Sequence, residues 1–182
     1  MGDLVAAPST RRRAQGLAGG CDFGLESRFM QDRNLMLALY EPDIAANTGA
    51  MLRTCACFGA EAAIIEPAGF VFSDRRFRRA GMDYLDALDI ARHVSFAAFE
   101  AWRRREGRRL ALLTTRGDAD LWDFRFEAGD VLMVGRESAG VPEAVHEAAE
   151  ARVRIPIRAA LRSLNVGVAA AVALAVRQLS RR

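Results

Sequence analysis

The sequence feature that most constrains the fold is a regular alternation of short apolar runs with helical stretches between residues 35 and 178. Short, almost uninterrupted apolar runs are typical of strands that are buried on both faces. When such strands alternate with helices along a chain, the usual result is a parallel sheet with helices packed on both of its faces. We therefore predict an α/β domain of this architecture.

The predicted strands span residues 35–40, 62–66, 92–94, 110–115, 130–134 and 153–156. The predicted helices span residues 47–58, 96–105, 142–150 and 164–178. Asn47 and Ser163 are suited to N-cap the first and last of these helices, because their side chains accept hydrogen bonds from free backbone N–H groups. Pro142 suits the first turn of the third helix, where a missing N–H costs nothing.

The first 33 residues differ from the rest of the chain. They are rich in Gly, Ala, Arg and Ser, include three consecutive Arg at residues 11–13, and show no sustained periodicity. We predict a flexible N-terminal extension over residues 1–33 and one domain over residues 34–182. The extension could serve as an RNA-binding arm, or the native start could lie at Met30 or Met36.

The composition is that of a globular protein with a core, because 51% of the residues are hydrophobic and 27% are charged. The net charge of +3 permits a nucleic-acid partner without requiring one. Cys21, Cys55 and Cys57 lack the spacing of a zinc site, so we expect no metal. There is no apolar signal segment, and the longest uncharged, mostly apolar run (residues 163–176) is too short to cross a bilayer. We expect a cytoplasmic protein.

Candidate ligand-binding residues follow the predicted strands, where open α/β sheets bind their ligands. After the first strand, Gly49 would let a phosphate or sugar approach free backbone N–H groups next to Asn47. Arg53 lies six residues beyond Asn47 and could reach the same rim. The alternative is that Asn47 only caps the helix and Arg53 is only a solvated charge.

A later loop and the last predicted helix also contain features that indicate binding. Gly135 and Gly140 follow the strand at residues 130–134 and could expose backbone groups to a ligand, or could form an ordinary turn. The last predicted helix has no charged residue before Arg177, which predicts contact with a second subunit and hence a dimer. The glycine-rich fingerprints of nicotinamide and ATP enzymes are absent from the sequence.

Taken in order, these loops resemble the three motifs of the SPOUT RNA methyltransferases, in the branch that methylates ribose 2′-hydroxyls. The matching segments are residues 47–53, 135–142 and 155–165. Residues 39–44, 65–70 and 78–84 further resemble the small single-domain members that modify cytidine or uridine at the tRNA wobble position, 34. The resemblance implies a C-terminal trefoil knot, a homodimer, tRNA as substrate and S-adenosylmethionine as methyl donor.

The resemblance also implies roles for individual residues. The methyl donor would contact Leu113, Gly135, Ile155 and Ser163. Arg53 would face the ribose, where it either loses its proton transiently through a phosphate contact or stays charged and stabilises the developing alkoxide. The remaining predicted catalytic residues would orient Arg53 and the ribose; they are Asn47, Glu137 and Asn165.

A basic segment supplies the predicted RNA-binding patch, with Phe77 placed to stack on a base. Its basic residues are Arg75, Arg76, Arg78 and Arg79. The alternative is a solvated helix face with Phe77 turned inward. Rival functions are 2′-O-methylation of ribosomal RNA or of another tRNA position, and a non-catalytic RNA-binding module on the same fold.

Overall fold

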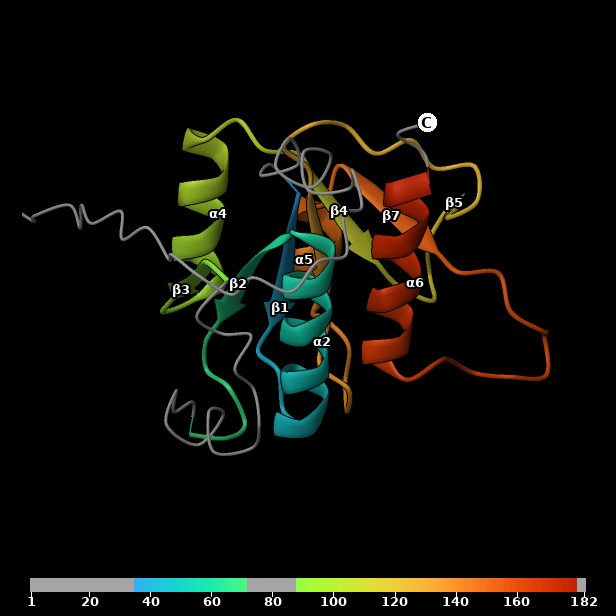
Figure 1. Ribbon diagram of the computed structural model, residues 1–182, viewed down its shortest axis with the longest axis horizontal. Helices are drawn as coiled ribbons and strands as arrows, with labels where there is room; N and C mark the ends of the chain where they lie inside the picture. Colours follow the sequence, from blue (N-terminus) through green and yellow to red (C-terminus); the bar gives the residue numbers. More distant parts are fainter. Residues whose placement is uncertain (1–34, 72–87, 180–182) are drawn as a thin grey trace, which may run out of the picture.

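The structure is a computed structural model that describes residues 35–71 and 88–179. Within these residues, seven parallel strands form one sheet in the order β3-β2-β1-β6-β4-β7-β5 (Figure 1). This confirms the predicted parallel α/β architecture. The strands are β1 (Met36–Tyr40), β2 (Glu61–Ile65), β3 (Ile90–His93), β4 (Leu110–Leu113), β5 (Ala119–Asp120), β6 (Val131–Val134) and β7 (Ala151–Arg154).

Helices cover both faces of the sheet, as predicted. One face carries α2 (Ala45–Phe58) and α6 (Val166–Leu179), which lie side by side, and the other carries α4 (Phe96–Arg105) and α5 (Glu143–Ala148) (Figure 1). No helix within the described ranges combines the length and apolar character that crossing a membrane requires.

The central strand β1 divides the core into two parts. Successive side chains of a strand point to opposite faces. Leu37 and Leu39 therefore pack on the side of α2 and α6, while Ala38 and Tyr40 pack on the side of α4 with Phe99. Burying a large apolar side chain contributes about 1.5–3 kcal/mol, which explains why β1 is apolar at every position.

Strand boundaries depart from the predictions by up to two residues, including the end of the central β4, predicted at residue 115 and observed at Leu113. β3 begins two residues earlier than predicted, and β5 was not predicted because a two-residue strand carries no apolar pattern. The prediction for β7 was displaced by two residues. Pairing with β4 places β7 at Ala151–Arg154, and Pro156 lies beyond the strand because it has no N–H to donate.

Both predicted N-caps are wrong. α2 begins at Ala45 with Ile44 as its N-cap, so Asn47 lies inside the first turn. α6 begins at Val166, and its first N–H groups bond to the side chain of Asn165 rather than Ser163. For α6 the loop contains a second residue suited to cap the helix, Asn165, whereas the N-cap residue of α2, Ile44, makes no side-chain cap hydrogen bond.

The strand order places a topological switch point between β1 and β6. The chain leaves β1 toward β2 on one side, whereas β6 pairs with β4 on the other. Loops that leave neighbouring strands in opposite directions open a crevice at the carboxyl edge of the sheet. This edge is at the bottom of Figure 1, where α2 and α6 also begin.

Candidate active site

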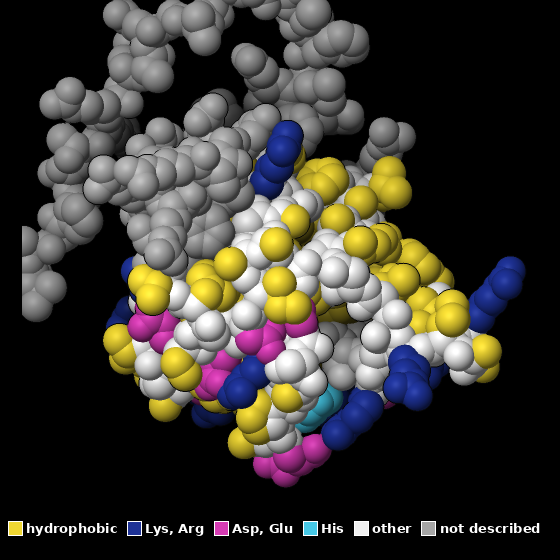
Figure 2. All heavy atoms as spheres, turned by 90° about the horizontal axis from the view of Figure 1, so that it is seen from below, with side chains coloured by type: hydrophobic (Ala, Val, Ile, Leu, Met, Phe, Trp, Pro, Cys, Tyr) yellow, Lys and Arg dark blue, Asp and Glu magenta, His cyan; other side chains and the backbone are white. Residues whose placement is uncertain are grey.

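A cavity of about 520 Å³ lies at the carboxyl edge of the sheet, beyond β4, β6 and β7. Figure 2 looks onto this end of the molecule. The volume falls in the range of small-molecule sites, roughly 300–1,000 Å³. The structure brings the three predicted loops together here, and the predicted residues that line the cavity are Asn47, Leu113, Gly135, Glu137, Ile155, Ser163 and Asn165.

The loop after β6 is closed on itself by two backbone hydrogen bonds. The Arg136 N–H donates to the Gly140 carbonyl oxygen (3.0 Å), and the Gly140 N–H donates to the Arg136 carbonyl oxygen (2.9 Å). A Cβ on Gly135 would lie 2.7 Å from the Gly140 carbonyl carbon, and Gly140 itself has a φ of +67°. Both positions therefore require glycine. The tight loop fixes Glu137 in the cavity wall.

Asp43 joins the loop after β1 to the loop after β6. Its carboxylate accepts hydrogen bonds from the backbone N–H groups of Glu137 (3.1 Å) and Ser138 (3.3 Å) and from the Ser138 hydroxyl. The Asp43 N–H donates to Glu137 Oε2 (3.3 Å). The hydrogen bond with Glu137, opposed by burial and assisted by Ser138, lowers the pKa of Asp43 from 3.8 to about 2. An ionised Asp43 therefore holds the two loops together.

Glu137 places a carboxyl group in the cavity wall. Burial, and then the hydrogen bond shared with Asp43, raise the pKa of Glu137. Its Oε1 is buried and has no hydrogen-bond partner by geometry among the described residues, while the nearby Asn47 side chain acts to lower the pKa of Glu137. A buried polar atom without a partner costs about 1–3 kcal/mol. A ligand that donates an N–H or O–H group to this oxygen would recover that free energy.

Two asparagines join the starts of α2 and α6. Asn165 Nδ2 donates to Asn47 Oδ1 (3.1 Å). Asn165 Oδ1 accepts from the N–H groups of Gly167 (2.9 Å) and Val168 (3.2 Å), which caps α6. Asn165 therefore uses both ends of its amide, and the two asparagine side chains are held at the cavity wall in a defined orientation.

Arg53 lies on the exposed side of α2 and does not line the cavity. It is six residues beyond Asn47, about 9 Å along the helix axis. The predicted RNA-binding residues Arg75, Arg76, Arg78 and Arg79 lie outside the described residues, as does the extension over residues 1–33. Their roles, and that of Arg53, stay predictions.

The sequence of residues 34–175 matches the SpoU rRNA methylase family. The chain belongs to this family. A tRNA (cytidine(34)-2′-O)-methyltransferase from Beijerinckia indica subsp. indica is 64% identical over 146 residues, which are 79% of this chain and 91% of the relative.

Solved structures of family members share the fold. One, described as giving structural insights into the 2-OH methylation of C/U34 on tRNA, is 39% identical, with a TM-score of 0.75 over 81% of this chain and 95% of that one. An AdoMet-bound rRNA methyltransferase from Sinorhizobium meliloti is 27% identical, with a TM-score of 0.73 over 82% of this chain and 57% of that one.

Two residues that shape this family member's site were not predicted. Asp43 links the loops, and Arg136 lines the cavity, pairs with Glu41 and places its guanidinium 5.8 Å from the centre of the Tyr40 ring. Asp43 could have been found, because a carboxylate in the loop after the first strand lies at the edge where ligands bind. The contacts of Arg136 link segments about 95 positions apart, so no local pattern indicates them.

Proposed function

We propose that this protein is a tRNA methyltransferase that transfers a methyl group from S-adenosylmethionine to the ribose 2′-hydroxyl of cytidine or uridine at wobble position 34. The proposal extends to this chain the activity named for the Beijerinckia indica relative and the reaction described for the 39% identical structure. The observation that carries it is the cavity that gathers three separate loops at the switch point of the sheet.

The cavity wall suits a nucleoside that bears a sulfonium group. Apolar side chains, including Leu113 and Ile155, can hold an aromatic base, and Glu137 Oε1 can accept a hydrogen bond from an amino or hydroxyl group. Arg136 and Glu137 are the charged residues of the wall, so it carries no excess of positive charge against a cationic donor. We assign donor contacts to Leu113, Gly135, Ile155 and Ser163.

Bound S-adenosylmethionine would supply a methyl group that its sulfonium has already activated. The protein therefore has to align the ribose and to favour transfer of the hydroxyl proton to solvent water as the O–C bond forms and the S–C bond breaks. Alignment can contribute about 7–11 kcal/mol in favourable cases. Asn47, Glu137 and Asn165 are placed to orient the ribose, because all three line the cavity and Asn165 is bonded to Asn47.

Arg53 would supply positive charge to the developing alkoxide from the α2 side. A guanidinium stays protonated far above neutral pH, so electrostatic stabilisation suits it better than proton abstraction. Among the described residues, no cluster of His, Cys, Asp and Glu side chains is arranged to hold a metal ion. The proposed reaction assigns no step to a metal.

The proposed active form is a homodimer. The expectation that α6 is buried nearly all round holds only for its inner side, because Val168 is 51% exposed within the single chain. Leu164 in the preceding loop is also exposed, and hydrophobic side chains gather along one flank of the end seen in Figure 2. A second copy on this face would bury them. The C-terminal trefoil knot stays a prediction from the SPOUT resemblance.

The test is methylation of a tRNA pool by the purified full chain, followed by nuclease digestion and mass spectrometry. We expect new 2′-O-methylcytidine or 2′-O-methyluridine at position 34. A methyl group at another tRNA position, or on ribosomal RNA alone, would contradict the proposal. Calorimetry with S-adenosylmethionine separates an enzyme from a binding module, because a module that holds only RNA would give no binding heat.

A further inference from the structure

A second hollow, of about 310 Å³, adjoins the cavity of the candidate active site. Residues 154–159 form most of its wall, and Leu161 and Arg162 complete it on the side of α6. Thr115, Ile155 and Ile157 line both the hollow and the cavity. A ligand that fills the cavity and a ligand in the hollow would therefore lie on two sides of one shared wall.

The charge of the second hollow differs from that of the cavity. Its wall contains Arg154, Arg158 and Arg162 and no acidic residue. Arg154 pairs with Asp120, with Nε 2.6 Å from Oδ1. Arg158 and Arg162 are exposed and form no ion pair within residues 35–71 and 88–179. The charges of Arg158 and Arg162 disfavour a sulfonium compound in this hollow and favour an anion.

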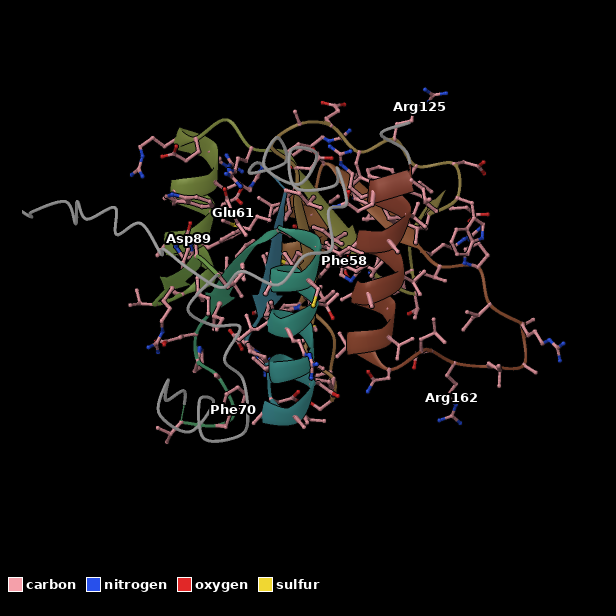
Figure 3. All side chains as sticks on the ribbon, in the orientation of Figure 1. Phe58, Glu61, Phe70, Asp89, Arg125 and Arg162 are labelled. Atoms are coloured by element: carbon pink, nitrogen blue, oxygen red, sulfur yellow. The ribbon has the colours of Figure 1, made fainter. Side chains whose placement is uncertain are left out.

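The backbone keeps Arg158 and Arg162 on one short segment. The Leu161 N–H donates to the Arg158 carbonyl oxygen (2.9 Å), which closes a turn between the two arginines. In Figure 3 the labelled Arg162 extends away from the loop that precedes α6, and Figure 2 shows basic side chains along this flank. Guanidinium groups match the oxygens of a phosphate through paired N–H donors.

We infer that this hollow binds a backbone phosphate of the RNA substrate, next to the nucleotide whose ribose enters the cavity. The inference rests on the proposed function, because it assumes that an RNA ribose is the methyl acceptor. A polynucleotide is favoured over a free anion because the hollow shares a wall with the cavity. A strand that places one nucleotide in the cavity carries its neighbouring phosphate across that wall.

The test compares the double variant Arg158→Gln/Arg162→Gln with Arg104→Gln/Arg105→Gln. The control removes the same charge from exposed positions of α4. For the first variant we expect the KM for tRNA to rise at least tenfold, with kcat within about twofold. The slope of log affinity against log salt concentration should fall by roughly 0.7–0.9 for each phosphate that the variant no longer binds. The control should leave both parameters near wild type.

Binding of S-adenosylmethionine distinguishes the ligands of the two sites. Its Kd should not change in Arg158→Gln/Arg162→Gln, and a rise in that Kd with an unchanged KM for tRNA would overturn the inference. Equal KM values and salt slopes for both variants would also overturn it while leaving the proposed function standing. If the wild-type chain methylates no tRNA, filter binding of tRNA decides: weaker binding by the first variant alone supports the phosphate site, and equal or absent binding refutes it.

Discussion

The two ends of the sheet differ in how fully their charged side chains are paired with other groups of the protein. At the amino ends of the strands, Arg103 is only 2% exposed, and it contacts carboxylate oxygens of Glu100 at 2.7 Å and of Glu150 at 2.9 Å. Asp130, 1% exposed, pairs with Arg109 at 2.7 Å. Buried charges need such partners, because removing one from water costs several kcal/mol.

At the carboxyl ends, some polar groups hold the loops together, as Asp43 does, and others lack partners among the described residues. Glu137 has a buried oxygen without a hydrogen-bond partner among the described residues, and Arg158 and Arg162 form no ion pair there. In Figure 3 the labelled Glu61, which pairs with Arg108, and the labelled Arg162 lie toward opposite ends of the molecule. The difference indicates that one end of the sheet stabilises the fold, whereas the other is shaped for ligands that complete it.

Substitution of Arg53 tests the carboxyl end most strongly. Arg53→Ala should lower kcat for tRNA methylation by roughly 10²–10³, about 2.7–4 kcal/mol, as for other groups that stabilise developing negative charge. The Kd for S-adenosylmethionine and the free energy of unfolding should stay near wild type, because Arg53 is exposed and does not line the cavity. Arg53→Lys keeps the charge and should retain more activity. Undiminished methylation by Arg53→Ala would reject the role.

Substitution of Arg103 tests the amino end of the sheet. It should lower stability and leave turnover unchanged, which is the opposite of the result expected for Arg53→Ala. Arg103→Ala leaves Glu100 and Glu150 without their buried partner, so the free energy of unfolding should fall by about 3 kcal/mol in urea denaturation. Turnover measured below the unfolding transition should be unchanged. Arg104→Ala is the matched control, because Arg104 pairs with the same Glu100 but is exposed, and it should cost less than about 0.5 kcal/mol. Equal losses would remove the distinction between the ends.

Substitution of Asp43 tests the contact between the loop after β1 and the loop after β6. Asp43→Asn removes a charge that accepts three hydrogen bonds, so stability at pH 7 should fall by about 1.5 kcal/mol and the Kd for S-adenosylmethionine should rise. The lowered pKa of Asp43 sets the pH window. Its contribution is present above the ordinary value of 3.8 and is lost as pH falls through about 2. Urea midpoints of the two proteins should therefore converge between pH 4 and pH 2, and a constant gap would contradict this role.

The sequence predicts the parts of the molecule that depend on local pattern. The apolar run of β1 and the helical spacing of α4 predicted those elements, and the structure places both within one residue of the predicted bounds. The loop motifs identified the cavity wall because their positions follow strand ends that the parallel topology brings together.

The remainder depends on contacts between distant segments. The bonds from Glu137 and Ser138 to Asp43 join residues about 94 positions apart, and the arginine-lined hollow exists only because β7 is followed by a particular turn. The start of a helix is also hard to predict from sequence where two residues could serve as its cap, as Ser163 and Asn165 could for α6. The choice then depends on tertiary contacts, such as the bond between Asn165 and Asn47.

The cap of α6 gives the smallest expected effect and separates two residues of the same loop. Asn165→Ala removes the acceptor for the Gly167 and Val168 N–H groups, so stability should fall by about 1 kcal/mol. Ser163→Ala should leave stability near wild type, because α6 begins three residues later with Asn165 as its acceptor. Thermal unfolding of both variants decides between them. A larger loss of stability for Ser163→Ala would show that Ser163, the residue predicted from the sequence, caps α6. The start of α6, and with it the cavity wall, would then differ from this structure.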